Sequence, residues 1–558
     1  MYRRKASAFV GLKRGFSPMA AMWLATVMGS GCGETPGSNV EENVGSVAPP
    51  DVAALAAEGA AVAVDDAAGG TPTSVTVNAK KTLAKFTPIS VGLNSAAWDV
   101  HLIDPEVHAA LTSGAIQTLR YPGGSTSDNY HWSSNLPDDP NQGGTVPEAN
   151  FDAFMSVAQA AGARPMITVN YGSGTPQEAA DWVRYANRGE PHYKGPVPTY
   201  PGASVKGHRY GVRYWEVGNE LYGDGTYGAT WEVNKKSHDP TTYAQGVVSY
   251  SKAMKAVDPS IRVGAVLTAP GNWPDGQLSA SSPQPWNDTV LPIACGAIDF
   301  VVVHWYAQGP TGESDAGLLM SPELGEGTNV SYTPSIPTMV ATLKALLTQY
   351  CGKHADAVQI MVTETNSVSY NPGKQTTSLV DALFMADQLL TWFENGVANV
   401  DWWALHNGPF DGNVDPALYG NYNFGDYGIL SAGGTTAGGA VEPPVNTPFP
   451  AYFGFQMLSY LGHHEQDAML ETASSNQLVT VHAVRQCDGA ISLMVINKDP
   501  TVRYDLNVAL KGAASHGWAS VYRYGMNSAS ITRAQKQVRG TTFTVSVEPY
   551  SLTTIKLP

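Results

Sequence analysis

The chain is organised around one predicted strand and the turn after it, Tyr214-Trp215-Glu216-Val217-Gly218-Asn219-Glu220. The first residues of this stretch predict a β-strand, and that strand runs into the tripeptide Gly-Asn-Glu. A second stretch, Ile360-Met361-Val362-Thr363-Glu364-Thr365-Asn366, has a similar form, with an apolar run that leads to Glu364. Two strands that each bring a glutamate to the C-terminal end predict a site that several parallel strands build together.

Around these two stretches the chain repeats one unit, which is an apolar β-run, a polar loop and a helical run. The predicted strands lie at 88–94, 115–121, 164–171, 212–220, 262–267, 298–306, 358–366 and 400–406. Eight such units in order predict an α/β fold, a (β/α)8 TIM barrel over residues 88–462. The alternative is a doubly wound open sheet, which does not explain why polar residues collect at the C-terminal ends of nearly every strand.

Glu220 and Glu364 end the fourth and seventh predicted strands, so they face each other across the mouth of a closed barrel. Two carboxyl groups about 5 Å apart, one on each side of a glycosidic carbon, hydrolyse the bond with retention of configuration. In this interpretation Glu364 attacks the anomeric carbon, while Glu220 protonates the leaving oxygen and then deprotonates water. We expect Glu220 to be protonated, because of poor solvation or because of the negative charge of Glu364.

Several other residues are predicted to bind the substrate or to hold the carboxylates. Asn219 is placed to bind a sugar hydroxyl next to the reacting carbon, and Arg120 and Tyr306 are expected to donate to Glu364. His304 shares a strand face with Tyr306. The remaining predicted binding residues are Asn170, Trp132, Trp98, Trp402 and His406.

Core packing is the alternative for the aromatic and histidine residues in this set. Trp402 and Trp403 are adjacent on a strand and therefore point to opposite faces, so at most one of them faces the cleft. The sequence does not decide which one does.

Three motifs together resemble one known family. They are Leu119-Arg120-Tyr121-Pro122-Gly123-Gly124 with His131-Trp132, then Thr168-Val169-Asn170-Tyr171-Gly172-Ser173-Gly174-Thr175-Pro176, then the stretch that ends in Glu220. Their order and spacing are similar to the α-L-arabinofuranosidases of the clan A retaining glycosidases (family 51). The resemblance covers about residues 88–462. It implies the barrel, a C-terminal β-sandwich, Glu220 as acid/base and Glu364 as nucleophile.

The chain departs from that family at two positions. The family usually has Asn after Tyr-Pro-Gly-Gly, where it contacts the arabinose, and here the residue is Ser125. The family usually follows the nucleophile with Trp, and here the residue is Thr365. Both changes fall at the sugar-binding subsite. Related clan members that act on xylosides, glucuronides or β-glucans therefore remain alternatives.

The segments on either side of the barrel have other patterns. Residues 463–558 contain β-runs without helical runs, which predicts an antiparallel β-sandwich. Residues 74–87 are expected to add a strand to it, because this strand precedes the barrel and has no helix after it. Residues 33–73 are rich in Gly, Ala, Pro and acidic residues, which predicts a disordered linker.

Residues 1–32 look like a bacterial lipoprotein signal, with Cys32 as the lipidated residue. Basic residues precede an apolar run at 19–28 that is too short to span a bilayer. An ordinary secretory signal with a chance cysteine is the alternative, and both interpretations predict export. Export permits disulfides. Cys295 and Cys351 each lie just before a predicted strand, so either a bridge between them or two buried thiols fits.

Composition narrows the choice of partners. The net charge of −15 argues against a nucleic acid, because phosphate binding requires basic surfaces. We see no metal-ligand cluster and no nucleotide loop, so no metal or cofactor is expected. The predicted partner is a polysaccharide or oligosaccharide, with membrane contact only through the lipid anchor, and the oligomeric state is not predicted. We therefore expect an exported retaining hydrolase that releases α-L-arabinofuranosyl residues, with a non-catalytic carbohydrate-binding surface protein as the rival of another class.

Overall fold

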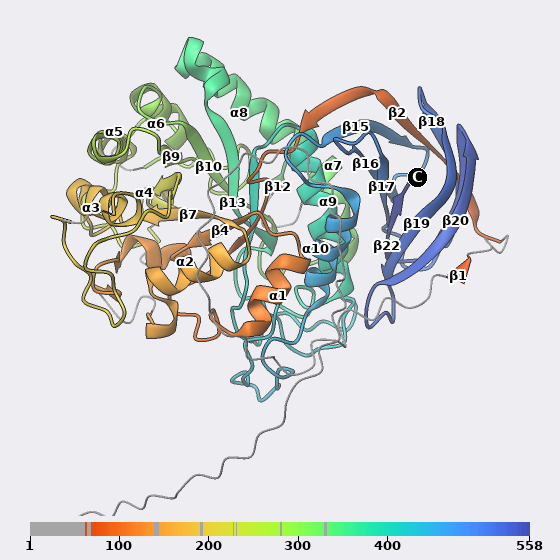
Figure 1. Ribbon diagram of the computed structural model, residues 1–558, viewed down its shortest axis with the longest axis horizontal. Coiled ribbons are helices and arrows are strands. Elements are labelled where there is room, and N and C mark those ends of the chain that lie inside the picture. Colours follow the sequence, from red (N-terminus) through yellow and green to blue (C-terminus); the bar gives the residue numbers. More distant parts are fainter. Residues whose placement is uncertain are drawn as a thin grey trace, which may run out of the picture.

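The structure is a computed structural model that describes residues 62–63, 69–138, 144–189, 193–226, 228–229, 231–279, 282–327 and 332–558. The predicted signal segment 1–32, with Cys32, and most of the predicted linker lie outside the described residues. Figure 1 shows two parts, a barrel surrounded by helices and a sheet lobe that contains the C-terminus.

Eight parallel strands form a closed barrel, which confirms the predicted TIM fold. The ring closes because β14 pairs with β3, while β10 joins β9 to β13. On the shorter path around this ring, β9 and β10 separate β8 from β13. The strands are β3 (Val91–Asn94), β4 (Thr118–Tyr121), β7 (Arg164–Val169), β8 (Tyr214–Val217), β9 (Arg262–Val266), β10 (Phe300–Gln308), β13 (Gln359–Val368) and β14 (Asn399–Trp402).

One main helix follows each strand and covers the outside of the barrel (Figure 1). Local sequence starts several of them, since side chains of Asn150, Thr175 and Asp239 accept hydrogen bonds from the first turns of α2, α3 and α5. The sequence pattern did not predict α6, because Pro292 interrupts its interior. The helices are α1 (Pro105–Ser113), α2 (Phe151–Ala160), α3 (Pro176–Asn187), α5 (Pro240–Val257), α6 (Trp286–Ala294), α8 (Ile336–Cys351), α9 (Leu379–Glu394) and α10 (Pro450–Leu461).

Shorter elements lie in the connections between these strands and helices. Two of them, η2 and α4, follow β4 and β8 and contribute to the site described below. The short elements are η2 (Gly124–Asp128), β5 (Tyr130–His131), β6 (Leu136–Pro137), η3 (Pro147–Ala149), α4 (Leu221–Thr226), α7 (Asp315–Leu324), β11 (Glu326–Gly327), β12 (Tyr332–Thr333) and η4 (Gly352–Ala357).

A second sheet forms the predicted C-terminal β-sandwich and has its own apolar core. Side chains alternate between buried and exposed along β18, as expected for a strand with one face against a core. The strand order is β1-β20-β19-β22-β17-β16-β15-β2-β18-β21. The strands are β1 (Val62–Ala63), β2 (Thr71–Lys85), β15 (Ala468–Ser474), β16 (Val479–Arg485), β17 (Ile491–Asn497), β18 (Tyr504–Lys511), β19 (Ser515–Gly525), β20 (Thr532–Gly540), β21 (Thr542–Val547) and β22 (Ser551–Lys556).

The N-terminal strand β2 lies inside this sheet, between β15 and β18. It begins at Thr71, three residues before the predicted strand at 74–87, and buries Thr73 against the sandwich core. β1 pairs with β20 at the opposite end of the strand order. The predicted linker 33–73 is therefore too long at its C-terminal end. Composition could not show this, because the pairing uses backbone groups rather than a recognisable apolar pattern.

A disulfide joins Cys295, which follows α6, to Cys351, the last residue of α8. The two Cα atoms are 5.3 Å apart, within the range that a disulfide spans. The sequence left this pair open between a bridge and two thiols, and the structure shows the bridge. It ties two neighbouring helices on the outside of the barrel.

Buried charges connect the barrel to the sandwich. Lys498, which directly follows β17, contacts Asp387 of α9 at 2.6 Å and Glu323 of α7 at 2.9 Å. His482 of β16 lies 2.9 Å from Asp387 and 2.8 Å from Glu394. Burial lowers the pKa of His482, but the charges and hydrogen bonds of Glu394 and Asp387 raise it to about 10. The interface is therefore an ionic network as well as an apolar contact.

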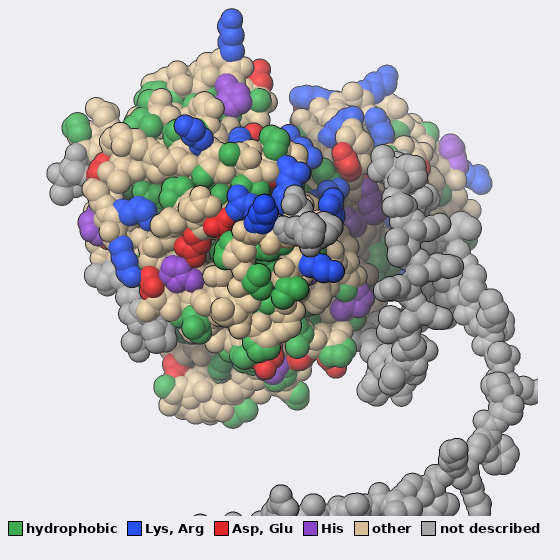
Figure 2. Space-filling model, turned by 60° about the vertical axis from the view of Figure 1, so that its left-hand side comes forward, with side chains coloured by type: hydrophobic (Ala, Val, Ile, Leu, Met, Phe, Trp, Pro, Cys, Tyr) green, Lys and Arg blue, Asp and Glu red, His purple; other side chains and the backbone are tan. Residues whose placement is uncertain are grey.

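Acidic and basic side chains lie next to one another on the face of the molecule drawn in Figure 2. Within the described part of the chain, no helix combines the length and the apolar character that crossing a membrane requires.

Candidate active site

The turn after β8 presents the first glutamate. At Gly218, φ is +78°, and a Cβ atom there would lie 2.4 Å from Leu221, so this position requires glycine. Glu220 itself has φ of +32°, a backbone conformation that costs a non-glycine residue roughly 1–3 kcal/mol. Its Oε1 accepts hydrogen bonds from Tyr222 (2.9 Å) and from Nδ1 of His304 (2.8 Å). A strained turn of this kind is typical of functional sites.

Arg120 of β4 is fully buried beneath this turn and forms four hydrogen bonds. Its Nε donates to Glu216 (2.7 Å) and one Nη to Asn219 (2.9 Å). The other Nη donates to Asn94 (2.9 Å) and to Oε1 of Glu364 (3.0 Å). Burial alone would lower the pKa of Arg120, but the charges of Glu216 and Glu364 have the larger effect, so the pKa is above its usual value. The guanidinium therefore stays a cation. As predicted from the sequence, it donates to Glu364.

Glu364 of β13 has donors on both carboxylate oxygens. Besides Arg120 on Oε1, the hydroxyl of Tyr306 donates to Oε2 over 2.9 Å, and His304 Nδ1 lies 3.5 Å from the same oxygen. One ligand-type atom from each of Glu220, His304 and Glu364 lies within 4.8 Å of the other two. This spacing would also suit a metal ion, a grouping that the sequence analysis did not predict.

His304 of β10 changes the expected protonation of the acidic pair. Burial raises the pKa of Glu220, but the hydrogen bond and the positive charge of His304 lower it below its usual value. Burial lowers the pKa of His304, while the charge of Glu364 and the contact with Glu220 raise it above its usual value. Both directions favour the proton of the pair on His304 rather than on Glu220 in the free protein. The expectation of a protonated Glu220 did not take this base into account, which lies 2.8 Å away.

Two predicted binding residues are used by the scaffold instead. The Asn170 amide donates to Ser173 and to the Tyr130 carbonyl, and its oxygen accepts from the backbone of the loop after β7. His406 has partners on both ring nitrogens, Asp99 at 2.8 Å and Asn446 at 2.9 Å. Polar residues at strand ends can bind either a ligand or the adjoining loops, and here both bind loops.

The structure separates the tryptophans into core residues and half-buried residues. Trp132 stacks on Trp182 with ring centroids 6.0 Å apart, and Trp402 packs beside Phe384, so both belong to the core. Trp403 is half-buried instead, and its ring lies against Gly124, where an added Cβ would be 3.0 Å away. Trp98, in the turn after β3, is half-buried as well. Strand alternation therefore turns Trp403, rather than Trp402, away from the core.

Asp128, at the end of η2, holds the site together through backbone groups. Its carboxylate accepts hydrogen bonds from the N–H groups of Tyr171 and Gly172 (3.1 Å each) and of Asn219 (2.8 Å). Burial raises its pKa to about 7 in spite of these three donors. Asp128 therefore joins the loop after β7 to the turn that carries Glu220.

Glu232, in the connection between α4 and α5, is an acid that the sequence analysis missed. It is 3% exposed, and its Oε1 accepts a hydrogen bond from Ser125 Oγ over 2.6 Å. Burial and the negative charges of Glu220 and Asp128 raise the pKa of Glu232 well above its usual value. The only signal in the sequence was the long insertion after the fourth strand, which has no periodic pattern.

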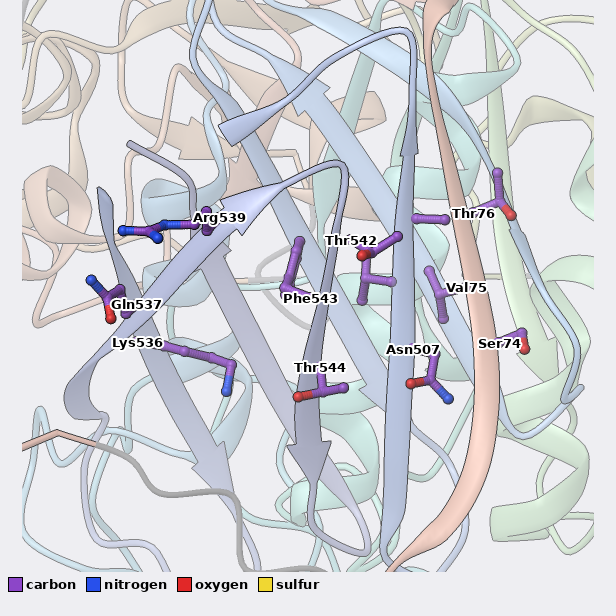
Figure 3. A pocket seen from close by; sticks show the side chains of 12 residues that line it. Ser74, Val75, Thr76, Asn507, Lys536, Gln537, Arg539, Thr542, Phe543 and Thr544 are labelled. Atoms are coloured by element: carbon purple, nitrogen blue, oxygen red, sulfur yellow. The ribbon is translucent and has the colours of Figure 1, made fainter. Parts of the chain in front are cut away.

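A groove of about 690 Å³ lies elsewhere, in the β-sandwich between β2, β18, β20 and β21 (Figure 3). Lys536, Arg539 and Phe543 line it together with threonine, serine and amide side chains. Its lining contains no carboxyl group. The groove therefore cannot supply a pair of acids, and the candidate active site is the mouth of the barrel.

No family model matches the chain. A relative from Aspergillus fumigatus, a probable α-L-arabinofuranosidase C, is 28% identical over 219 residues, which are 37% of this chain and 40% of that relative. An intracellular exo-α-L-arabinofuranosidase from Bacteroides ovatus is 30% identical over 146 residues, or 24% of this chain and 28% of that protein. The chain thus spans well under half the length of these relatives, and they confirm the resemblance seen in the motifs.

Solved structures extend the likeness to the whole fold. An α-L-arabinofuranosidase from Thermotoga maritima in complex with arabinose has a TM-score of 0.63 at 20% identity, over 87% of this chain and 99% of that one. A family 44 xyloglucanase from Paenibacillus polymyxa has a TM-score of 0.60 at 16% identity, over 87% and 99%. The barrel and sandwich are therefore shared by proteins with different named activities.

Replacing Arg120 is expected to destabilise the protein. Arg120→Met removes the cation that pairs with the buried Glu216 and donates to Glu364, which should lower the free energy of unfolding by roughly 3–5 kcal/mol. Urea denaturation followed by circular dichroism measures the change. Arg164→Met, at the exposed start of β7, is the matched control and should change stability little. Equal losses in the two variants would contradict the role given to Arg120.

Proposed function

We propose that this protein is a retaining glycoside hydrolase that releases α-L-arabinofuranosyl residues from plant-type polysaccharides or oligosaccharides. The observation that carries the proposal is the pair of carboxyl groups, Glu220 and Glu364, whose oxygens approach within 4.8 Å at the mouth of the barrel. Retaining enzymes hold their two acids about 5 Å apart, whereas inverting enzymes leave room for a water molecule.

In the proposed mechanism Glu364 is the nucleophile. Hydrogen bonds from Arg120 and Tyr306 orient its carboxylate, and one oxygen attacks the anomeric carbon to form a covalent glycosyl-enzyme. Glu220 gives a proton to the leaving oxygen and then takes one from the water that hydrolyses the intermediate. His304 passes the proton that the pair holds to Glu220, across their 2.8 Å hydrogen bond, before Glu220 protonates the leaving oxygen. The proton that Glu220 later takes from water restores the starting state of the pair. Asn219, fixed through its oxygen by Arg120, keeps its amide nitrogen for a sugar hydroxyl.

The choice of arabinofuranose rests on the named relatives and on the three sequence motifs. The rival is a related hydrolase that acts on xylosides, glucuronides or β-glucans, which the likeness to a xyloglucanase supports. Of the two departures from the family, Ser125 contacts Glu232, whose pKa responds to the charges of Glu220 and Glu364. Thr365 is fully buried, and its hydroxyl donates to Gln388 of α9 over 3.5 Å, so its side chain faces the helix layer and the expectation that it lies at the sugar-binding subsite was wrong. A non-catalytic carbohydrate-binding protein would have no need of two acids held this close together.

Replacing the acids tests the reaction. With an aryl α-L-arabinofuranoside, Glu364→Gln should lower kcat on the order of 10³-fold or more, because the nucleophile is lost. Glu220→Gln should lower kcat roughly 10²- to 10⁴-fold on a substrate with a poor leaving group and less on the aryl substrate. Proton NMR of the first product should show retention.

The control is Glu106→Gln, on the exposed side of α1, which should act like the unmodified protein. Inversion of configuration, or unchanged turnover by Glu364→Gln, would contradict the proposed roles. Turnover of pyranosides but of no furanoside would favour the rival hydrolase.

The pH dependence tests the contact between His304 and Glu220. The pair holds one proton, and the raised pKa of His304 keeps it there beyond the ordinary pKa of a histidine. Below the pKa of His304 the pair holds the proton that the leaving oxygen needs. Above that pKa the pair loses this proton, so kcat/KM should fall on the alkaline side. In His304→Asn the carboxyl alone holds the proton, so the fall should begin at lower pH. His108→Asn, exposed on α1, is the control, and identical profiles for both variants would exclude the pair.

We also propose that the protein is exported and anchored to a membrane through a lipid on Cys32. The basic and apolar residues before Cys32 support this, as does the disulfide between Cys295 and Cys351, since such bonds persist in oxidising compartments. When the gene is expressed in bacteria fed labelled palmitate, the protein should take up label, and Cys32→Ala should not. An unlabelled protein in the culture medium would indicate the ordinary secretory signal.

A further inference from the structure

Glu232 is buried near the two proposed catalytic acids, yet the mechanism above does not use it. One carboxyl oxygen, Oε1, accepts the hydrogen bond from Ser125. The other, Oε2, is enclosed and has no hydrogen-bond partner among the described residues. A buried carboxyl group with an unused oxygen is costly, so it calls for an explanation beyond packing.

The segment that carries Glu232 is firmly held. The backbone N–H of Lys235 donates to the Gly172 carbonyl over 2.9 Å. The Lys236 ammonium donates to the Gly174 carbonyl over 3.1 Å and lies 4.5 Å from the centre of the Tyr171 ring. These contacts fix the segment against the loop after β7, which Asp128 ties to the catalytic turn. Glu232 therefore has a defined position relative to that turn.

Ser125 lies on η2, between contacts that this short helix makes with two sides of the barrel mouth. At one end of η2, Gly124 lies against the half-buried Trp403. At the other end, Asp128 holds the N–H of Asn219, the residue before Glu220. The short helix thus bridges the two sides of the barrel mouth, and the half-buried Ser125 stands between them. Its hydroxyl hydrogen is directed at Glu232, which leaves the lone pairs of its oxygen for another donor.

The charge on Glu232 follows from its neighbours. Burial, together with the negative charges of Glu220, Asp128 and Glu364, opposes ionisation and raises the pKa of Glu232 well above its usual value. An uncharged carboxyl group can hold the serine hydroxyl without adding negative charge beside the nucleophile. It thereby avoids repelling the electron-rich oxygens of a sugar.

We propose that Glu232 is a positioning residue that sets the sugar specificity of the site by orienting Ser125. Oε1 of Glu232 accepts a hydrogen bond from the Ser125 hydroxyl, and the Ser125 oxygen in turn accepts a hydrogen bond from one hydroxyl group of the sugar whose bond is cleaved. The pair therefore recognises a sugar hydroxyl that donates to Ser125, at one of the two positions where the chain departs from the family. This inference rests on the proposed function but not on the identity of the sugar.

The test pairs protein variants with substrates that each lack one hydroxyl. The probes are the aryl glycoside that the unmodified protein cleaves best and its mono-deoxy analogues. For the unmodified protein, removing one particular hydroxyl should lower kcat/KM about tenfold through the lost hydrogen bond. The same removal should have no further effect in Glu232→Ala or Ser125→Ala. Glu232→Gln should keep most of the discrimination, because its uncharged amide oxygen also accepts from Ser125.

Two controls separate this role from a purely structural one. Glu148→Gln, on the exposed side of η3, should match the unmodified protein in every assay. Thermal unfolding reports any loss of stability in Glu232→Ala. A lower melting temperature with unchanged penalties for every deoxy analogue would overturn the proposal, and so would a Glu232→Gln variant as impaired as Glu232→Ala.

Binding to Glu364→Gln, measured by calorimetry with the same set of glycosides, repeats the comparison without turnover. If the unmodified protein cleaves a pyranoside but no arabinofuranoside, the proposed substrate fails while the role of Glu232 is still tested. If sugars bind but are never cleaved, the enzyme assignment fails, and the calorimetric penalties decide the role of Glu232 alone.

Discussion

The buried guanidinium of Arg120 joins four parts of the barrel through its hydrogen bonds. A charge without water must be paired, and this one has partners on three other barrel strands, Asn94, Glu216 and Glu364, as well as Asn219 in the catalytic turn. A shift of β8 by one residue would turn Glu216 away from Arg120. The register of the barrel and the geometry of the acidic pair are therefore set by the same four hydrogen bonds.

Periodic features of this protein could be predicted from its sequence. The barrel follows from repeated apolar runs, and Glu220 and Glu364 stand out because each comes at the end of such a run. Arg120, His304 and Tyr306 were found by the same reasoning, and the structure brings all of them together with the acids. Where Pro292 interrupts α6, or where β1 is a strand of two residues, no pattern exists to be recognised.

Residues in irregular loops were beyond such prediction. Glu232 and Asp128 form hydrogen bonds with partners that are distant in sequence, and the neighbouring sequence does not predict those contacts. Conversely, Asn170 and His406 are polar residues at strand ends, as a binding site requires, but their side chains form hydrogen bonds with loops of the protein itself. Whether a polar side chain is available to a ligand depends on its unused donors and acceptors, and these appear only in three dimensions.

The place of β2 has a consequence for how the chain is made. This strand is completed near the start of synthesis, but it lies between β15 and β18, and Asn78 meets Glu471 across 393 positions of sequence. The sandwich can therefore close only after the ribosome has translated the entire barrel. A nascent chain that has just finished its barrel carries a strand with both edges unpaired, and these edges are covered only when β15 and β18 have emerged from the ribosome.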